Sequence, residues 1–180
     1  VFRGPRAQGA FTLGMVMRPP WSVEVRAEAR LTIVAVVAGS LAGESRADGV
    51  VHQIGPGQVL LLCDPDHYVL HEADAELSTD GAQIVVHPGQ HCVDRLGRSL
   101  EQPFMRGVRT WGNDPAGDTT LLLGTYETIG ETGRSLLAML PPVAVVDAEA
   151  MGTPIVDLLA TELVRDVPGQ EVVLDRLLDL

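Results

Sequence analysis

Short apolar runs separated by turn residues dominate the first two thirds of the chain. Ala10–Met17 carries apolar side chains at alternate positions from Phe11 to Met17, the period expected of a half-buried strand. Leu31–Ala38 is almost wholly apolar and β-branched, which indicates a central strand of a sheet. Because the runs recur at roughly 8–12-residue spacing, the sequence predicts a mainly β fold, an antiparallel sandwich or barrel. Further strands are predicted at Trp21–Arg26, Val50–Ile54, Val59–Cys63, His67–Leu70, Gln83–His87, His91–Val93, Val108–Trp111 and Thr119–Tyr126.

The stretch Gly55–Leu70 lies at the centre of this pattern. A Gly-Pro-Gly turn precedes the continuous apolar run Val59–Cys63, which we expect to be buried on both faces. An Asp-Pro-Asp turn then leads into His67–Leu70, so the simplest interpretation is two strands joined by a tight turn. The stretch also brings a Cys, a His and a Tyr close together along the chain.

Helical spacing replaces the strand pattern after residue 130. Glu131–Leu140 has leucines at helical intervals and ends at a Pro pair, Val143–Val146 is typical of one more strand, and Thr153 followed by Pro marks a helix start. Glu171–Leu180 is amphipathic, and we expect its apolar stripe to form a dimer or linker contact. We therefore divide the chain into a β domain over residues 1–130 and a helical region over residues 131–180. The stripe comprises Val173, Leu174, Leu177 and Leu178.

Composition narrows the class of protein. The 180-residue chain has a net charge of −11, and its 13 basic residues are all Arg. The absence of Lys excludes Schiff-base catalysis, and the acidity disfavours direct contact with nucleic acid, which requires clustered positive charge. No apolar run is long enough to span a membrane and no signal-peptide pattern is present, so we expect a cytoplasmic protein. The start at Val1, without an initiator Met, suggests a fragment.

Metal-ligating residue types occur, but not in the pattern of a metal enzyme. A metal-dependent β-barrel enzyme of the cupin type needs His-x-His and a Glu on an early hairpin plus a later His, because the ligands must converge on one ion. No His-x-His follows Gly39. We therefore predict no bound metal, no other cofactor and no catalytic residue, with a small metal-dependent cupin enzyme as the alternative. The ligand-type residues are His52, His67 and His71, and the group His87, His91 and Cys92, which a Pro-Gly turn also explains as a hairpin.

Two cysteines are too few for a disulfide framework, and the sequence leaves open whether a single Cys63–Cys92 bond forms. Cys63 and Cys92 each have a His nearby in the sequence, and a nearby charged His can lower the pKa of a thiol and make it reactive. A redox sensor based on these two residues is therefore a second alternative. The competing interpretation is that each thiol is buried and acts as a small apolar side chain.

An apolar pocket with polar groups at its edge is the favoured site. The methionines and aromatic residues on or beside the predicted strands suit such a pocket, and a few histidines and arginines supply hydrogen-bonding groups. Ordinary core packing is the competing interpretation for each residue taken alone. The candidate ligand-binding residues are Met17, Trp21, His52, His67, Tyr68 and Trp111.

A series of segments across most of the chain resembles one family. The sequence is similar to the N-terminal, cupin-like effector domains of AraC-type transcriptional regulators of the actinobacterial kind. The segments occur in the family's order. They are GAFTLGMVMRPPWSVEVR (9–26), LTIVAVVAGS (31–40), IGPGQVLLLCDPDHYVL (54–70), IVVHPGQHC (84–92), GVRTWGNDPAGDTTLLLGTY (107–126), SLLAMLPP (135–142) and PIVDLLATELVRDVPGQEVVLDRLLDL (154–180).

The resemblance implies a cupin-like β-barrel followed by α-helices that connect to, or pair beside, a C-terminal module of two helix-turn-helix motifs. That module is absent from this chain, so DNA would be contacted only through it. The implied role is sensing of a small-molecule effector and homodimerisation, without enzymatic activity and without membrane association. Cupin-like domains of this family usually lack a complete metal triad, and some relatives in the broad group sense oxidants through cysteines, a possibility that here concerns Cys63 and Cys92.

Overall fold

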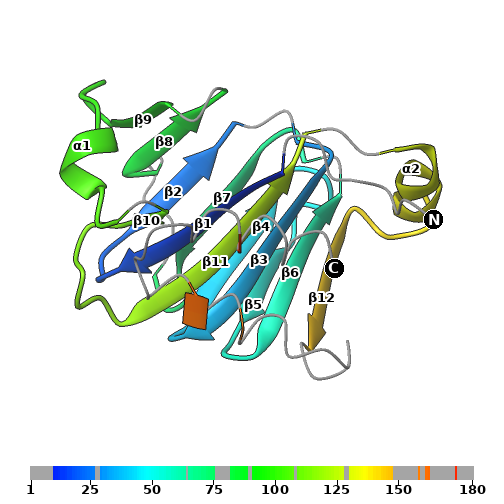
Figure 1. The fold of residues 1–180 in the computed structure, drawn as a ribbon, viewed down its shortest axis with the longest axis horizontal. Helices are drawn as coiled ribbons and strands as arrows, with labels where there is room; N and C mark the ends of the chain where they lie inside the picture. Colours follow the sequence, from blue (N-terminus) through cyan, green and yellow to red (C-terminus); the bar gives the residue numbers. More distant parts are fainter. Residues whose placement is uncertain are drawn as a thin grey trace.

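In the part of the chain that the structure describes, twelve strands form two six-stranded sheets that pack face to face as a sandwich (Figure 1). The computed structural model describes residues 10–26, 29–63, 65–75, 82–88, 91–107, 109–127 and 130–147, together with Leu158, Thr161, Glu162 and Val173. The sandwich confirms the predicted mainly β fold. Two pairs of neighbouring strands are parallel, so both sheets are mixed.

The first sheet, sheet A, has the order β10-β1-β11-β3-β6-β12. Its long central strands are the ones with the most continuous apolar sequence, and each is paired on both sides. Only the β1–β10 pair is parallel in this sheet. The strands are β1 (Ala10–Met17), β3 (Leu31–Ala38), β6 (Gln58–Cys63), β10 (Thr110–Trp111), β11 (Thr119–Tyr126) and β12 (Val143–Asp147).

The second sheet, sheet B, has the order β5-β4-β7-β2-β8-β9. Two short helices, α1 (Glu101–Phe104) and α2 (Glu131–Leu137), accompany the sheets. Figure 1 shows α1 beside β9 at one side of the sandwich and α2 with β12 at the other. The strands of sheet B are β2 (Ser22–Val25), β4 (Leu41–Ser45), β5 (Val51–Ile54), β7 (Tyr68–Glu72), β8 (Ile84–His87) and β9 (His91–Asp94).

The sequence interpretation of Gly55–Leu70 needs one correction. Both predicted strands exist as β6 and β7, but they do not pair with each other, because β6 belongs to sheet A and β7 to sheet B. The turn after Cys63 therefore carries the chain from one sheet to the other. The structure also contains a strand that is not among the predicted ones, β4, which includes Glu44 and Ser45.

The core lies between the sheets and explains the period-two pattern. Val34, Leu60 and Leu121 point inward from sheet A, and Leu41 and Leu70 do so from sheet B, each at most 1% exposed. Burying a side chain of this size stabilises the fold by about 1.5–3 kcal/mol relative to leaving it in water. The outer face of sheet A carries a second, smaller buried cluster, so β6 is buried on both faces as expected. That cluster comprises Ala35, Val59 and Leu122.

The loop between β10 and β11 is fastened to the end of β1. The backbone N–H of Arg18 donates to Asn113 Oδ1 at 2.7 Å, and the Asn113 amide donates back to the Arg18 carbonyl at 2.8 Å. Arg18 Nε also donates to Asp114 at 2.7 Å. Gly112 allows this close approach, because a Cβ there would lie 1.8 Å from the carbonyl oxygen of Val16.

The predicted helical region 131–180 contributes a strand to the sandwich. β12 pairs with β6 at the edge of sheet A, as the pattern at 143–146 suggested. Val173, in the predicted dimer helix, is helical and 44% exposed, whereas Leu174, Leu177 and Leu178 lie outside the described residues. Within the described part of the chain, no helix is long and apolar enough to cross a membrane.

The substitution Gly112→Ala is expected to destabilise the fold by at least about 2 kcal/mol, because the added methyl group overlaps the backbone of β1. Chemical denaturation measures the change in the free energy of unfolding. Gly130→Ala is the control, since a Cβ at Gly130 meets no atom within 4 Å. Equal stability of the two variants would contradict the close approach of Gly112 to β1.

Candidate ligand-binding cavity

An apolar cavity of about 670 Å³ opens between the two sheets on the side where α1 lies. The core fills the rest of the interior, whereas here the α1 segment, residues 100–105, joins the edge strand β9 of sheet B to the edge strand β10 of sheet A. The volume falls within the range of about 300–1,000 Å³ that is usual for small-molecule sites. The lining residues are Leu13, Met15, Val23, Val25, Ala29, Tyr68, Leu70, Val86, His87, Pro88, His91, Cys92, Glu101, Met105, Gly107, Thr110, Trp111, Leu123, Thr125 and Glu127.

The α1 segment forms the outer wall of the cavity and is tied to both sheets. The backbone N–H of Leu100 donates to the carbonyl of Cys92 in β9 at 2.8 Å. At its other end, Gly112 N–H donates to the carbonyl of Phe104 at 2.9 Å. The Phe104 and Trp111 rings pack against each other with centroids 4.9 Å apart. These contacts hold the wall at a fixed distance from the sheets.

Alternating residues of the strands form the apolar floor. β1 contributes Leu13 and Met15, and β2 contributes Val23 and Val25 from the opposite sheet. Leu123 of β11 is paired with Leu13 in sheet A, and the same alternation brings the next inward positions of β11 into the cavity wall. The floor therefore follows from the period-two pattern of the strands.

Two buried aromatic residues supply polar atoms inside this apolar surface. Tyr68 is 2% exposed, and burial raises the pKa of its hydroxyl to about 12, so it is a neutral group at physiological pH. Trp111 is 9% exposed, and its indole nitrogen has no hydrogen-bond partner among the described residues. A buried donor without an acceptor is costly, so an acceptor placed beside Trp111 would be stabilised.

The opening of the cavity carries histidines and carboxylates. His87 and His91 are directly opposite each other in the β8–β9 hairpin, which the Pro-Gly turn predicted. His91 Nδ1 lies 3.0 Å from Glu101 Oε1, and both side chains are exposed. Glu127 is exposed at the end of β11. No Arg lies among the described residues that line the cavity.

Of the six predicted ligand-binding residues, two line the cavity and four do not. Tyr68 and Trp111 line the cavity, and their role in binding stays a prediction. Met17 and Trp21 do not line it, because they are fully buried in the core further along the sandwich.

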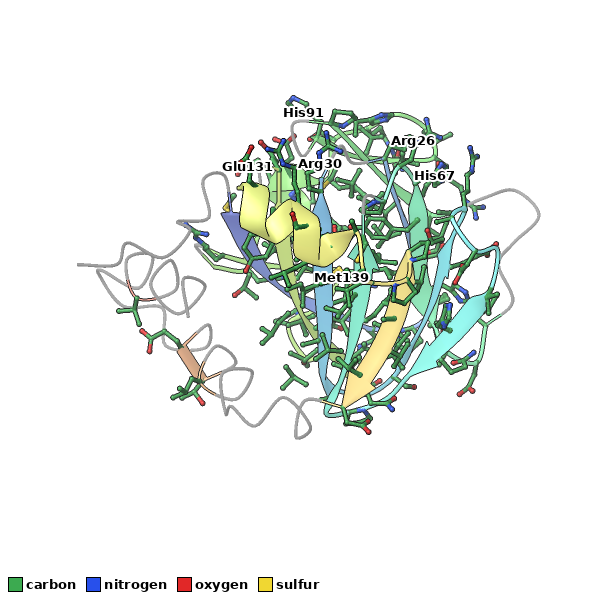
Figure 2. The ribbon with its side chains drawn as sticks, turned by 90° about the vertical axis from the view of Figure 1, so that its right-hand side faces the viewer. Arg26, Arg30, His67, His91, Glu131 and Met139 are labelled. Carbon is green, nitrogen blue, oxygen red and sulfur yellow. The ribbon has the colours of Figure 1, made fainter. Side chains whose placement is uncertain are left out.

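The two predicted histidines lie away from the cavity. His52 lies in the edge strand β5, and its Nε2 is 2.7 Å from Asp48 Oδ2. His67 Nε2 lies 3.0 Å from Glu24 Oε1, and Arg26 donates to the same carboxylate at 2.7 Å, with Arg26 and His67 side by side in Figure 2. The hydrogen bond from Arg26 lowers the pKa of Glu24. Both histidines therefore have carboxylate partners on the molecular surface.

The two cysteines lie in different sheets, and no disulfide joins them. Cys63 is buried at the end of β6. Cys92 lies in the cavity wall, where burial and the negative charge of Glu101 raise the pKa of its thiol to about 11. Reactive cysteines have lowered pKa values instead, so this environment disfavours the thiolate that a redox role at Cys92 requires.

Convergent metal ligands do not occur in the part of the chain that the structure describes. No three of its His, Cys, Asp and Glu side chains are placed so that they could hold one ion. His71, the remaining candidate, is buried in β7, and its Nδ1 lies 2.8 Å from the carbonyl of Glu72.

Several lining residues were not predicted as site residues. Glu101 and Met105 belong to the α1 segment, for which the sequence shows no helical period. Thr125 and Glu127 continue the inward face of β11, and the alternation from Leu121 onward could have identified them. The missing information was which side of the sandwich remains open, and this depends on packing between sheets.

Fold and cavity together define a β-sandwich domain with an internal site, an architecture that includes the cupins. The sequence matches the cupin family over residues 1–180, and the chain therefore belongs to that family. No curated protein matches the sequence.

Solved structures of ToxT from Vibrio cholerae are similar in fold. Apo ToxT of strain SCE256, as a point variant, has 11% identity and a TM-score of 0.43, with 94% of this chain and 52% of that chain covered. Wild-type ToxT of the same strain with a bound unsaturated fatty acid has 10% identity and a TM-score of 0.40, with 94% and 50% covered. ToxT of strain O395 has 8% identity and a TM-score of 0.42, again with 94% and 50% covered. This chain spans about half the length of these ToxT chains.

Alkylation of Cys92 is expected to follow a titration with a midpoint near 11, because burial and Glu101 both disfavour the thiolate. The measurement is the rate of reaction with iodoacetamide against pH in a Cys63→Ala variant, which leaves one thiol. The denatured chain is the control and should titrate near the ordinary value of 9.0. A native midpoint of about 7.5 or lower would instead support a redox role.

Proposed function

We propose that this chain is the effector-sensing domain of a bacterial AraC-type transcription regulator of the actinobacterial type. A small, largely apolar molecule binds in the cavity between the sheets and controls DNA binding by a C-terminal helix-turn-helix module of the full-length protein. The domain is not an enzyme in this proposal. The family resemblance of the sequence suggests the class, and membership of the cupin family agrees with it.

The cavity is the observation that carries the proposal. It is about 670 Å³ in volume, and apolar side chains from both sheets make up most of its surface. Catalysis by a metal cupin needs at least three convergent ligands, and the described cavity residues offer histidines and carboxylates only at the opening. An apolar interior with a few polar groups is the usual form of a binding site for a small molecule.

The end of β11 offers a route from the cavity to the helices. Thr125 and Glu127 line the cavity, and α2 begins shortly afterwards at Glu131. A ligand that displaces the end of β11 would change the position of α2 relative to β12. Such a ligand shifts the regulator between states only if it binds one state more tightly than the other.

Homodimerisation is the second part of the proposal. The apolar stripe of the predicted C-terminal helix would pair with a second copy or with the linker to the DNA-binding module. In this proposal the protein acts in the cytoplasm, where it binds its small-molecule effector as a homodimer. DNA contacts come only from the helix-turn-helix module, in keeping with the net charge of −11.

The neutral apolar dye N-phenyl-1-naphthylamine is expected to bind this chain at a single site with increased fluorescence. Leu123→Trp should weaken binding at least about tenfold, because the larger side chain fills the floor of the cavity. Leu96→Trp is the control, since Leu96 is 77% exposed and lies outside the cavity. Unchanged binding in Leu123→Trp, or no binding to the unmodified chain, would refute a ligand site between the sheets.

Replacing two leucines of the apolar stripe, Leu174→Asp with Leu178→Asp, is expected to convert a dimer to a monomer. Charges in an apolar contact are desolvated without partners, which is strongly unfavourable. Sedimentation equilibrium of the chain continued past Leu180 measures the change, and Leu96→Asp is the surface control. A strict monomer before any substitution would eliminate the dimer from the proposal.

A further inference from the structure

We propose that the cavity selects an amphiphilic organic cation: an apolar body carrying a hydrogen-bond acceptor, with a quaternary or protonated amine at the opening. This inference rests on the proposed function, because it names the chemical class of the effector. It does not depend on how the domain communicates with DNA.

The charge at the opening favours a cation. Glu101 and Glu127 are the charged lining residues, and no Arg lies among the described residues of the wall. His91 lies against Glu101 at 3.0 Å and offsets part of that negative charge when it is protonated, whereas no ion pair is found for Glu127 among the described residues. The net charge of −11 adds a long-range potential of the same sign. The carboxylates that line the opening therefore favour a cationic head group over an anionic one.

Aromatic rings in the cavity wall also favour a cationic ligand. Tyr68 and Trp111 line the cavity from opposite sheets, and the face of an aromatic ring attracts a cation through its quadrupole. Neither side chain is charged at physiological pH, since the pKa of Tyr68 is raised to about 12. A cation that reaches past the opening thus keeps favourable contacts inside the cavity.

The indole nitrogen of Trp111 is a hydrogen-bond donor in the cavity wall that a ligand with an acceptor can use. Trp111 is 9% exposed, its side chain lines the cavity, and its nitrogen has no partner among the described residues and almost no accessible surface of its own. An uncharged ester, ether or hydroxyl oxygen on the apolar body reaches this donor after a small movement of the Trp111 side chain. A carboxylate would also satisfy it, but a charged acceptor would have to lose its hydration inside an apolar cavity, beside two carboxylates.

Three esters with matched apolar bodies test the head-group charge. Octanoylcholine is the cation, 3,3-dimethylbutyl octanoate is its neutral isostere, and mono-octyl succinate is the anion. Each is measured by displacement of N-phenyl-1-naphthylamine from the full chain at low ionic strength. We expect octanoylcholine to bind at least about tenfold more tightly than mono-octyl succinate, and the difference to shrink with added salt because the carboxylates are exposed.

Glu→Gln variants test whether the preference for a cation arises from the carboxylates at the cavity opening. Glu101→Gln combined with Glu127→Gln should bring octanoylcholine and mono-octyl succinate to within about threefold, with the neutral isostere unchanged. The control is Glu72→Gln, the same change of charge at the end of β7 away from Tyr68. This control should keep the full difference between cation and anion.

The outcomes separate this inference from the proposed function. Equal or tighter binding of mono-octyl succinate, with the dye still displaced, overturns the preference for a cation and leaves the small-molecule site intact. A preference for the cation that survives the double Glu→Gln change also overturns the assignment to Glu101 and Glu127. Failure of the dye and of all three esters to bind removes the proposed function and this inference together.

Discussion

Apolar contact between the inner faces of the two sheets is the interaction on which the rest of the structure depends. It fixes which alternate residues of each strand are apolar, and it explains why the long strands β3, β6 and β11 lie at the centre of sheet A. Where the contact is complete, the interior is solid core. Where the α1 segment joins the edge strands β9 and β10, the same kind of apolar surface lines a cavity instead. The cavity is therefore a local interruption of the contact that stabilises the fold.

Strands were predictable from the sequence, but their partners were not. Ala10–Met17, Leu31–Ala38 and Thr119–Tyr126 have in the structure the bounds that alternation or continuous apolar sequence predicted. The tight turn between β6 and β7 did not indicate that these strands lie in different sheets, because such a turn looks the same whether it closes a hairpin or joins two sheets. Which of these two cases occurs depends on which strands pair with each other. That pairing is determined by residues far apart in the sequence.

The candidate site shows the same division between local and long-range information. Residue type suggested Tyr68 and Trp111, which do line the cavity, but it also suggested Trp21 and His67, which do not. Trp21 and Trp111 are both buried tryptophans of the same core cluster, but only Trp111 also lines the cavity. His67 has a nearby carboxylate because Glu24, far from it in sequence, lies in the neighbouring strand.

The residues that line the cavity come from two kinds of segment, which differ in how they are distributed along the chain. Its floor comes from strands scattered along the chain, each of which also belongs to the core. Half of the lining residues found in the described part of the chain come instead from the single stretch between Val86 and Trp111. Replacing that one stretch would change which ligand the cavity binds, while the other strands of the two sheets stay the same. Related domains can therefore diverge in what they recognise while the sheets stay almost unchanged.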